Sequence, residues 1–416
     1  MTITTMQTRH ILFVSYDGMT DPLGQSQVIP YLAGLTKQGY TFTIMSCDKP
    51  EKYRAQREYV EKLIAPYPIR WISLPYHKKP PVLSSVYDFI KLKQAAHQLH
   101  REHPIDMVHT RPGVPQLVAL YLKKKFGIRF MNDIRGFWAD ERVDGGMWNL
   151  SNPLYKTVYR FFKKKEDDCI RVADYNTCLT YKGKEEILKW DHLPQPVKLD
   201  VVPCSVDLDL FDPAKTDPVL KEKFAAELNI GKDDFVISYL GSIGGWYMTR
   251  EMMQFAGILL KKIPKARFLF ISNNNHEDII AAANEFGIPA DKVIVKFGKR
   301  HEVPVLLSFS DFSLFFIKPC YSKISSSPTK HGEIMAMGIP VIANSGVGDV
   351  KEIVEKYNAG YVLDGFTAAE MEAVAEKISR GEKQFSPAAI REGAKDFYSL
   401  DKTLEVYASV YKKSFG

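Results

Sequence analysis

Short apolar runs alternate with helix-like segments along most of the chain. The first run, at residues 11–15, is followed by a loop rich in Gly, Pro and Asp, a helical pattern from about Gln25, and a second apolar run at residues 41–45. Short apolar runs separated by amphipathic segments are typical of parallel strands joined by helical crossovers. This opening therefore predicts a βαβ unit, and further strands are expected at IRWISLP, DMVHT and IRFMNDI.

The same alternation begins again at residue 234. Strands are expected at residues 234–241, 266–272, 292–298, 312–318, 340–344 and 360–363, and helices at residues 250–263, 276–286, 303–309, 328–337 and 349–357. Strict alternation predicts the α/β class and doubly wound parallel sheets, in which ligands bind beyond the carboxyl ends of the strands. We expect two Rossmann-like domains whose carboxyl edges face each other across a cleft.

The boundary between the two domains is predicted in LDVVPCSVDLDLFDP, where a buried strand runs into an Asp- and Pro-rich segment. We expect an N-terminal domain at residues 1–203 and a C-terminal domain at residues 204–399. A length of 416 residues agrees with two domains, because single cores rarely grow beyond about 250–300 residues.

The composition argues against several classes of protein. No stretch approaches the roughly 20 uncharged apolar residues of a membrane span, and the first residues lack the cleavage site of a signal peptide, so a cytoplasmic protein is expected. The five cysteines have no CxxC or CxxH spacing, which argues against a zinc site and against a disulfide framework.

The net charge of +7 is concentrated in the first domain. Residues 1–203 contain 30 Lys and Arg against 21 Asp and Glu, whereas the remainder contains 26 against 28. The densest basic runs, at residues 122–129 and 159–168, also carry aromatic and aliphatic residues, a mixture that can dock on anionic lipid head groups. A solvated helix face is the alternative. We hypothesise peripheral contact with the inner face of a membrane, and we expect no nucleic-acid partner because no recognition module is present.

Four loops that follow predicted strands carry candidate chemistry. In the first, SYDGMTDPLGQSQV, Gly18 and Gly24 allow a tight turn, and residues 25–27 would open a helix with free backbone N–H groups aimed at an anion or a sugar. Asp17 and Gln25 are the polar candidates here. An Asp–Gly turn without a ligand is the alternative.

The second loop is FMNDIRGFWADERVDGGMWN, which places Asp133, Arg135, Trp138 and Glu141 beyond a strand. Arg and carboxylate groups beside aromatic rings suit a polyhydroxylated ligand, because they supply bidentate hydrogen bonds for hydroxyls and flat faces for sugar rings. A surface ion-pair network that caps the sheet is the alternative.

The third loop is YLGSIGGWYMTREM. Gly241, Gly244 and Gly245 let the backbone approach a ligand closely, and Ser242 and Tyr247 lie among them.

The fourth loop, SSSPTKHGEIMAMG, is built like the start of a helix. Ser327 is expected to cap the helix, with Pro328 at its first position and Thr329 and Lys330 in its first turn. A helix start that carries a Lys and hydroxyls suits a diphosphate. Glu333 lies one turn further, where its carboxylate could accept both hydrogens of a ribose diol. The alternative is a capped core helix with Glu333 facing solvent.

The order of these parts resembles the family-four retaining glycosyltransferases of GT-B fold, also called group 1 glycosyltransferases. The most specific motif is GEIMAMGIPVIANSGVGDV, which is similar to the family's EAMACGxPVVA-type segment, and VPCSVDLDLF stands where the family often has a PNGVD-like turn. The resemblance implies a nucleotide-sugar donor held by the C-terminal domain, an acceptor held by the N-terminal domain, and no required metal or other cofactor. It also implies that the last helix, within residues 400–416, returns to the N-terminal domain.

The resemblance also assigns roles to the candidate residues. The candidate catalytic residues are Asp133 and Arg135; the candidate donor-binding residues are Gly24, Gly241, Ser242, Tyr247, Ser325, Ser327, Thr329, Lys330 and Glu333; and the candidate acceptor-binding residues are Asp17, Gln25, Trp138 and Glu141.

Three places depart from the family's pattern. Ser325 stands where the family has the first of two Glu residues, the second of which matches Glu333. Ser242 and Tyr247 stand where the family has an Arg and a Lys that neutralise the diphosphate, and Arg135 stands where the family has a His. Positive charge must therefore come from elsewhere in the chain.

Lys330 is the best candidate for that charge, and Lys323 or Arg250 is the second. The resulting prediction is a transferase that moves a sugar from a UDP-type donor to a hydroxyl of a glycan or lipid-linked acceptor, with retention, in bacterial cell-surface polysaccharide or glycolipid assembly. The alternatives are a nucleotide-sugar epimerase or hydrolase of the same architecture, and a non-catalytic sugar-binding protein on a degenerate transferase scaffold.

Overall fold

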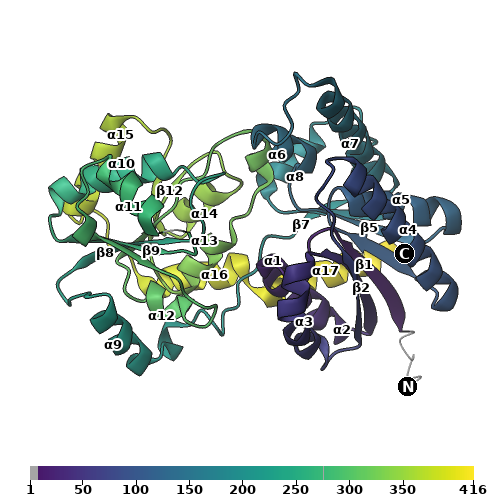
Figure 1. The fold of residues 1–416 in the computed structure, drawn as a ribbon, viewed down its shortest axis with the longest axis horizontal. Helices are drawn as coiled ribbons and strands as arrows, with labels where there is room; N and C mark the ends of the chain where they lie inside the picture. The colour runs from purple at the N-terminus through teal and green to yellow at the C-terminus, as the bar shows by residue number, and fades with distance from the viewer. Residues whose placement is uncertain (1–7, 275) are drawn as a thin grey trace. The chain divides into compact units, whose positions relative to one another are not determined.

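The computed structural model describes residues 8–274 and 276–416, which divide into two compact units. Unit 1 comprises the described residues up to Pro203 together with Leu400–Gly416, and unit 2 comprises Cys204–Ser399. Figure 1 shows that each unit is a sheet with helices on both faces. The division between the units falls in the Asp- and Pro-rich segment singled out in the sequence.

Unit 1 is built on a seven-stranded sheet in which every pairing is parallel. Its strands are β1 (Arg9–Ser15), β2 (Tyr40–Asp48), β3 (Ile69–Pro75), β4 (Met107–Thr110), β5 (Arg129–Ile134), β6 (Tyr175–Cys178) and β7 (Leu199–Val201), in the order β3-β2-β1-β4-β5-β6-β7. The register pairs Arg9 with Tyr40 and Ile11 with Met107.

The helices of unit 1 connect these strands. They are α1 (Pro22–Gln27), α2 (Ile29–Thr36), α3 (Pro50–Ile64), α4 (Leu83–Glu102), α5 (Val114–Phe126), α6 (Trp138–Asp144), α7 (Pro153–Val172), α8 (Tyr181–Leu188) and α17 (Leu400–Phe415). The first helix begins earlier than predicted, because Pro22 occupies its first turn and the Gln25 N–H donates to the carbonyl of Asp21 at 3.3 Å. The expectation of a free Gln25 N–H is therefore wrong.

Unit 2 has a six-stranded, all-parallel sheet. Its strands are β8 (Phe235–Leu240), β9 (Ala266–Ile271), β10 (Val293–Lys296), β11 (Phe312–Leu314), β12 (Val341–Asn344) and β13 (Gly360–Leu363), in the order β10-β9-β8-β11-β12-β13. Its helices are α9 (Pro218–Glu227), α10 (Thr249–Lys262), α11 (His276–Asn284), α12 (Val303–Leu307), α13 (Thr329–Ala336), α14 (Val350–Lys356), α15 (Ala368–Ser379) and α16 (Pro387–Tyr398), with short 3-10 turns η1 (Pro213–Lys215), η2 (Ala290–Lys292) and η3 (Tyr321–Ser325).

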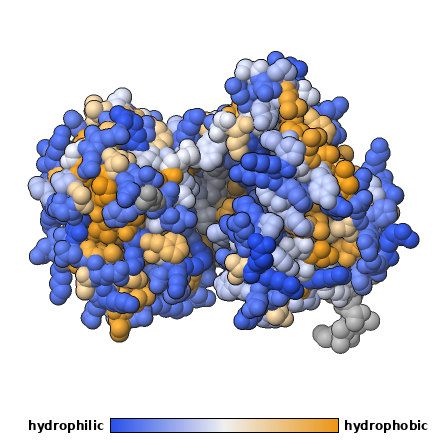
Figure 2. All heavy atoms as spheres, viewed as in Figure 1, coloured by the Kyte–Doolittle hydropathy of each residue, from blue (hydrophilic) through white to orange (hydrophobic). Residues whose placement is uncertain are grey.

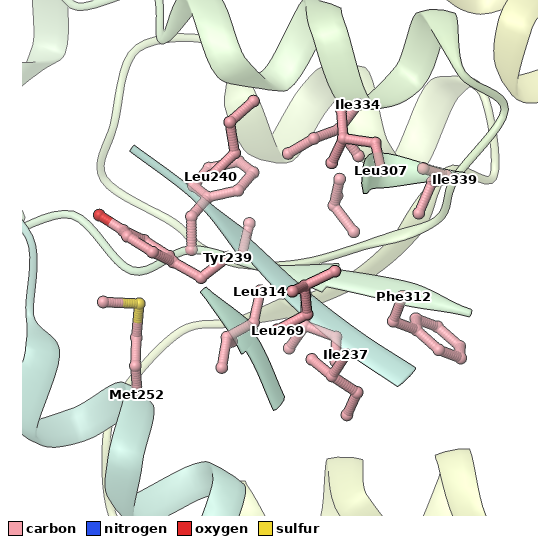
Figure 3. Close-up of a cluster of buried hydrophobic side chains, with 14 of the residues drawn as sticks. Ile237, Tyr239, Leu240, Met252, Leu269, Leu307, Phe312, Leu314, Ile334 and Ile339 are labelled. Carbon is pink, nitrogen blue, oxygen red and sulfur yellow. The ribbon is translucent and has the colours of Figure 1, made fainter. Parts of the chain in front are cut away.

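The core of unit 2 lies on both faces of its sheet. Figure 3 shows Ile334 of α13 on one side of the strands and Met252 of α10 on the other. Both side chains are at most 2% exposed and belong to one cluster with Ile237 and Leu269 of the central strands. Strands that are buried on both faces explain why their sequences read as unbroken apolar runs.

The last helix, α17, packs against unit 1. It contacts α2 and the strands β5, β6 and β7, and the side chain of Leu404 fills the space in which a Cβ on Gly34 would lie. Tyr407 donates a hydrogen bond to Oδ2 of Asp133 at 3.0 Å, and the Tyr411 hydroxyl lies 2.7 Å from Nδ1 of His109. The helix is therefore held by buried polar contacts as well as by apolar packing.

Asp133 is the centre of these contacts. It is 2% exposed, and its other carboxylate oxygen accepts a hydrogen bond from Thr177 at 2.8 Å. Burial alone would raise the pKa of Asp133, but the nearby Arg135 and His109 hold it well below its usual value. A carboxylate is thus kept ionised inside the core, which makes the loss of any of its donors costly.

We expect Tyr407→Phe to lower the free energy of unfolding by about 1–3 kcal/mol, because Asp133 then loses a hydrogen-bond donor that water cannot replace. The measurement is urea denaturation followed by circular dichroism. Tyr59→Phe is the matched control, since Tyr59 is 54% exposed on α3. Equal stability of the two variants would contradict the structural role of this contact.

Candidate functional site

The strand order of unit 2 marks a place for a ligand. The chain winds outward from β8 to β10 and then returns to β11 on the other side of β8. In such sheets the loops after the two strands at the reversal diverge, and ligands bind between them at the carboxyl edge. These are the loop at residues 241–248, after β8, and the loop at residues 315–328, which leads into α13.

The two loops are tied together by backbone hydrogen bonds. The Met248 N–H donates to the Phe316 carbonyl at 3.0 Å, and the Lys318 N–H donates to the Trp246 carbonyl at 2.9 Å. Gly241 has a φ of +119°, a conformation that side chains disfavour. The third and fourth candidate loops of the sequence therefore meet in one place.

The start of α13 differs from the prediction. Pro328 is the N-cap residue and provides no side-chain cap, and Thr329 is the first helical residue. The hydroxyl of Ser327 instead accepts a hydrogen bond from the Cys204 N–H at 3.3 Å. The expectation that Ser327 caps the helix is wrong, because a backbone donor 123 residues earlier in the chain occupies its hydroxyl oxygen.

Lys330 is a buried cation on the first turn of α13. The residue is 8% exposed, and its Nζ lies 3.7 Å from the ring centroid of Tyr247 and 4.4 Å from that of Tyr239, whose hydroxyl accepts a hydrogen bond at 3.3 Å. A Cβ on Gly241 would lie only 2.9 Å from Nζ, so the glycine leaves room for the amine. No carboxylate among the described residues lies within 4.0 Å of this Nζ.

The environment of Lys330 lowers its basicity. Burial lowers the pKa of Lys330 to about 7, although the charge of Glu333 acts in the opposite direction. Two tyrosine rings stabilise the cation only partly, since exposed cation–π contacts contribute about 0.5–1 kcal/mol and desolvated ones about 2 kcal/mol. The amine therefore lies in a place where a bound anion would complete its electrostatic environment.

Glu333 lies one turn further along α13 and is also buried. It is 7% exposed, and Nη1 of Arg300 donates to its Oε1 at 2.9 Å. Burial raises the pKa of Glu333, and Arg300 opposes that rise. The alternative of a solvent-facing Glu333 is thus wrong. Arg300 was missed in the sequence, although it follows β10 at the carboxyl edge.

Two further polar side chains are buried beside this helix. Ser325, at the end of η3, is 0% exposed, and its hydroxyl has no hydrogen-bond partner among the described residues. His331 is 0% exposed, its Nδ1 lies 3.0 Å from the Tyr398 hydroxyl, and burial lowers its pKa to about 3. His331 is neutral and was not singled out in the sequence.

Lys323 and Arg250, the other two candidates for the positive charge of the donor site, lie in different surroundings. Lys323 is 6% exposed, and its Nζ lies 3.8 Å from the ring centroid of Trp246, in the tied pair of loops. Arg250 is exposed on α10 and pairs with Glu285 at 2.8 Å. Lys323 therefore joins Lys330 at the candidate site of unit 2, whereas Arg250 has a surface partner.

The other candidates of the loop after β8 are arranged around Lys330. Tyr247 covers one side of the amine, and Ser242 is exposed, its carbonyl accepting a hydrogen bond from the Tyr239 hydroxyl. Thr329 is half-buried at the start of α13. The structure thus brings together, in unit 2, all the predicted donor-site residues except Gly24.

Gly24 lies in unit 1, in the loop after β1. A Cβ there would lie 2.6 Å from the Gly18 carbonyl, so this glycine is required for close packing of the turn. Asp17 is exposed in the same loop, and the side chain of Gln25 donates to Oε1 of Gln56 at 2.6 Å.

The second loop of unit 1 is more buried than expected. Asp133 lies inside the core, and Arg135 donates to the Val202 carbonyl at 3.3 Å, with its side chain 5% exposed. The ring of Trp138 packs against Arg142, whose Cζ lies 3.6 Å from the ring centroid, and against Gly113. Trp138 is therefore partly covered by its neighbours and keeps intermediate exposure, and its role towards a sugar stays a prediction.

Glu141 is half-buried on α6, beside Gly136. It is one of the candidate acceptor residues that keep partial access to solvent.

Some cations of the two basic runs are paired within unit 1. Lys123 and Arg129 both pair with Asp174, at 2.6 and 3.2 Å. Lys163 lies 2.8 Å from Asp140 and 3.0 Å from Glu166, whereas Lys124 and Lys164 are exposed. Such pairs are expected of an ordinary charged helix face, and membrane contact through the two runs stays a prediction.

The described residues offer neither a metal cluster nor a membrane-spanning helix. Residues 8–274 and 276–416 contain no group of three or more His, Cys, Asp or Glu side chains placed to hold a metal ion. Within the same ranges no helix is both long and apolar enough to cross a membrane.

Comparison with known proteins finds a family model that matches part of unit 2. Residues 221–396 are similar to the family described as glycosyl transferases group 1. The matched range contains Lys330, Glu333 and both of the tied loops.

A curated relative has a related but partial match. It is the UDP-Gal:alpha-D-GlcNAc-diphosphoundecaprenol alpha-1,3-galactosyltransferase of Escherichia coli, 21% identical over 252 residues. The match spans 60% of this chain and 60% of the relative, less than two thirds of the relative's length.

Solved structures match the whole chain. A glycosyltransferase from Rickettsia africae ESF-5 has a TM-score of 0.71 at 16% identity, covering 98% of this chain and 99% of that one. Anabaena Alr3699/HepE, solved with UDP and glucose, has a TM-score of 0.67 at 13% identity, covering 97% and 99%. These similarities confirm the predicted GT-B fold.

We expect Lys330→Met to raise the free energy of unfolding at pH 7, because Met fills a similar space without a buried amine. The ordinary pKa of Lys is about 10.4. Between pH 7 and pH 10 the unfolded chain therefore binds a proton that the folded site does not bind, so the stability of the wild type rises with pH. The advantage of the variant should shrink by about 2 kcal/mol between pH 7 and pH 9.

Urea unfolding at several pH values measures this difference. Lys232→Met, in an exposed loop before β8, is the control and should leave stability unchanged. If the difference in unfolding free energy between Lys330→Met and the wild type did not vary with pH, burial would not have lowered the pKa of Lys330.

Proposed function

We propose that this protein transfers a sugar from a nucleotide-diphosphate donor, bound at the candidate site of unit 2, to an acceptor hydroxyl. The observation that carries the proposal is Lys330, a buried amine at the start of a helix and beside the Gly241 loop, with no carboxylate of residues 8–274 and 276–416 within ion-pair distance. A buried charge needs a partner. The diphosphate of a donor would supply that partner.

The chemistry required of the site is stabilisation of a leaving group. Cleavage of the sugar–phosphate bond leaves negative charge on the diphosphate, and fixed positive groups in a desolvated site stabilise that charge. Lys330 and Lys323 would provide it, together with the backbone N–H groups at the start of α13. Glu333, held by Arg300, would accept hydrogen bonds from the ribose hydroxyls. In this proposal lysines perform the neutralisation and no metal is required.

A UDP-type donor is supported by two relatives. The Anabaena neighbour was solved with UDP and glucose, and the Escherichia coli relative is named for a UDP-galactose donor. That relative is also named for an acceptor linked to diphosphoundecaprenol. We therefore propose a glycan or lipid-linked acceptor, with a role in bacterial cell-surface polysaccharide or glycolipid assembly at the cytoplasmic face of the membrane.

The proposed stereochemical outcome is retention, with the acceptor attacking from the side of the leaving group. The departing phosphate would then take the proton of the acceptor hydroxyl. Asp133 is a poor candidate to orient that hydroxyl, since Thr177 and Tyr407 already occupy its oxygens. In unit 1 the exposed Asp17, in the loop after β1, is better placed to meet an acceptor.

A panel of UDP-, GDP-, ADP- and dTDP-sugars in a thermal-shift assay tests donor binding, because a ligand stabilises the state that binds it. We expect a UDP-sugar to stabilise the wild type. Lys330→Met and Glu333→Gln should each weaken that binding by about tenfold or more, since the first removes a cation and the second replaces a charged hydrogen-bond acceptor by a neutral one. Lys232→Met should bind normally.

The products of turnover separate the rival functions. Transfer requires UDP release that depends on an acceptor, and the proposed stereochemistry requires that the product retain the anomeric configuration of the donor. Release of UDP at the same rate without an acceptor would favour a hydrolase or epimerase, and binding without any turnover would favour a sugar-binding protein. Unchanged affinity in both variants would refute the assignment of the donor site.

The affinity for a nucleotide sugar should also depend on pH. Lys330, with a pKa of about 7 in the free site, must be protonated to face the diphosphate. Affinity should therefore be constant below pH 7 and fall towards tenfold per pH unit above it. UDP-glucose is the suitable probe, because its phosphates do not titrate in this range.

Isothermal titration in buffers of different ionisation enthalpy measures the accompanying proton uptake directly. Lys330→Arg is the control, since an Arg stays charged throughout the range and should give flat affinity. Binding by the wild type without proton uptake would contradict this coupling but not the donor site itself.

A further inference from the structure

The first two turns of α4 present apolar side chains to solvent. Leu83 is 66% exposed, Val86 and Tyr87 are each 48% exposed, and Ile90 is 40% exposed. We call these four residues the α4 apolar surface. Figure 2 shows apolar residues gathered on unit 1 over the elements labelled α4, α5 and α7 in Figure 1.

The spacing of these residues makes them one face of the helix. Positions 83, 86, 87 and 90 follow the i, i+3, i+4, i+7 pattern of a single stripe. The opposite stripe is already buried in unit 1, through Asp88, Leu92 and Ala96 among others. A helix that buries one stripe ordinarily presents a polar one to water, so this second apolar stripe calls for a partner.

The apolar exposure is confined to the beginning of α4. Further along the same helix the exposed positions are polar or charged: Lys91, Gln94, Gln98, Arg101 and Glu102. The loop that leads into the helix exposes Lys78, Lys79, Pro80 and Pro81. The α4 apolar surface is therefore bordered by lysines at both ends. Such an arrangement lets apolar side chains enter the acyl region of a membrane while the lysine amines stay among the polar head groups.

The exposed charge within the segment at residues 76–94 has one sign. Residues 76–94 contain four Lys and a single acidic residue, Asp88. Asp88 is 2% exposed and accepts hydrogen bonds from Tyr16 at 2.8 Å and from the His77 N–H at 3.1 Å. The surface that a partner would meet is thus apolar and positively charged.

The position of the surface matches the proposed acceptor edge of unit 1. The helix α4 follows β3, so it begins at the carboxyl edge of the sheet. Tyr16, whose hydroxyl bonds to Asp88 of α4, directly precedes Asp17 in the loop after β1. The loop with the exposed Asp17 and the α4 apolar surface therefore lie at the same end of unit 1.

We infer that the α4 apolar surface and the lysines that border it dock this protein on an anionic lipid bilayer. A bilayer offers apolar depth below a layer of negative charge, which matches both properties of the surface. A second copy of the chain, related by a two-fold axis, would bring the same lysines face to face. The inference gives the proposed function a membrane partner, and it does not depend on the donor site.

The inference places the membrane contact at the α4 apolar surface, and not at the basic runs that the sequence predicts for it. The runs at residues 122–129 and 159–168 were expected to make it, but Lys123, Arg129 and Lys163 are paired within unit 1. Lys78, Lys79 and Lys91 have no ion-pair partner among the described residues. Free lysines beside exposed apolar residues are the more suitable combination.

Flotation of the full chain with vesicles tests the inference. The vesicles are phosphatidylcholine alone, or phosphatidylcholine with phosphatidylglycerol at a ratio of three to one. We expect binding to the anionic vesicles that weakens with salt, because exposed charges are screened. Leu83→Ser combined with Ile90→Ser, and separately Lys78→Gln combined with Lys79→Gln, should each lower the partition coefficient about tenfold or more.

Two matched variants control for position. Val219→Ser removes an equally exposed apolar residue from unit 2, where Val219 is 75% exposed. Lys124→Gln combined with Lys164→Gln removes two exposed lysines from the originally predicted runs. Both should bind anionic vesicles as the wild type does, and circular dichroism should show all variants folded.

Three results would overturn the inference. The first is absence of vesicle binding, including the case in which the surface instead forms a dimer that Leu83→Ser abolishes. The second is equal binding to neutral and anionic vesicles, which would leave the lysines without a role. The third is loss of binding in the Lys124 and Lys164 variant but not in the α4 variants. UDP-sugar binding, measured in the same preparations, shows separately whether the donor site is intact.

Discussion

Every strand pairing in both sheets is parallel, and this constraint determines where the protein can perform chemistry. Each strand of a parallel sheet must be joined to the next by a crossover connection, so the carboxyl ends of all strands lie at one edge of the sheet. The loops that follow the strands therefore gather at that edge. In unit 2 the reversal between β8 and β11 separates two of these loops, and backbone hydrogen bonds at Met248 and Lys318 tie them together again. The candidate site is a consequence of this winding.

Each unit contains a buried charged side chain, and the two differ in how that charge is balanced. Asp133 has its partners inside unit 1, from Thr177 and from Tyr407 of α17, so its charge holds the last helix in place. The contacts that the described residues make to the Lys330 amine are two tyrosine rings and one neutral hydroxyl, and the more distant charge of Glu333 balances it incompletely. Since a buried ion without a counterion is destabilising, the first arrangement stabilises the fold and the second favours a bound anion.

The alternation of strands and helices was predictable because strands buried on both faces are continuously apolar. The helix at Lys330 was also predictable, but its surroundings were not. Ser327 binds the N–H of Cys204, and Glu333 is paired with Arg300, both through contacts between distant parts of the chain. Tertiary contacts also explain the pairing of the basic runs. The sequence around Lys163 does not reveal that the fold places Asp140 beside it. The local sequence pattern indicates which residues lie near the end of a strand. The hydrogen-bond and ion-pair partners of those residues depend on tertiary contacts, which the local pattern does not contain.

The replacement of loop cations by Lys330 has a physical consequence for the site. Where the family resemblance places an Arg and a Lys in the glycine loop, this chain has Ser242 and Tyr247, and the Tyr247 ring covers the amine of Lys330. A cation on a loop stays hydrated and charged, but a cation under two aromatic rings is desolvated, and its pKa is lowered accordingly. Any anion that binds beside Lys330 would therefore favour uptake of a proton as well as balance the charge. In the proposed function that anion is the diphosphate of the donor, and the positive charge of this site would then depend on the ligand.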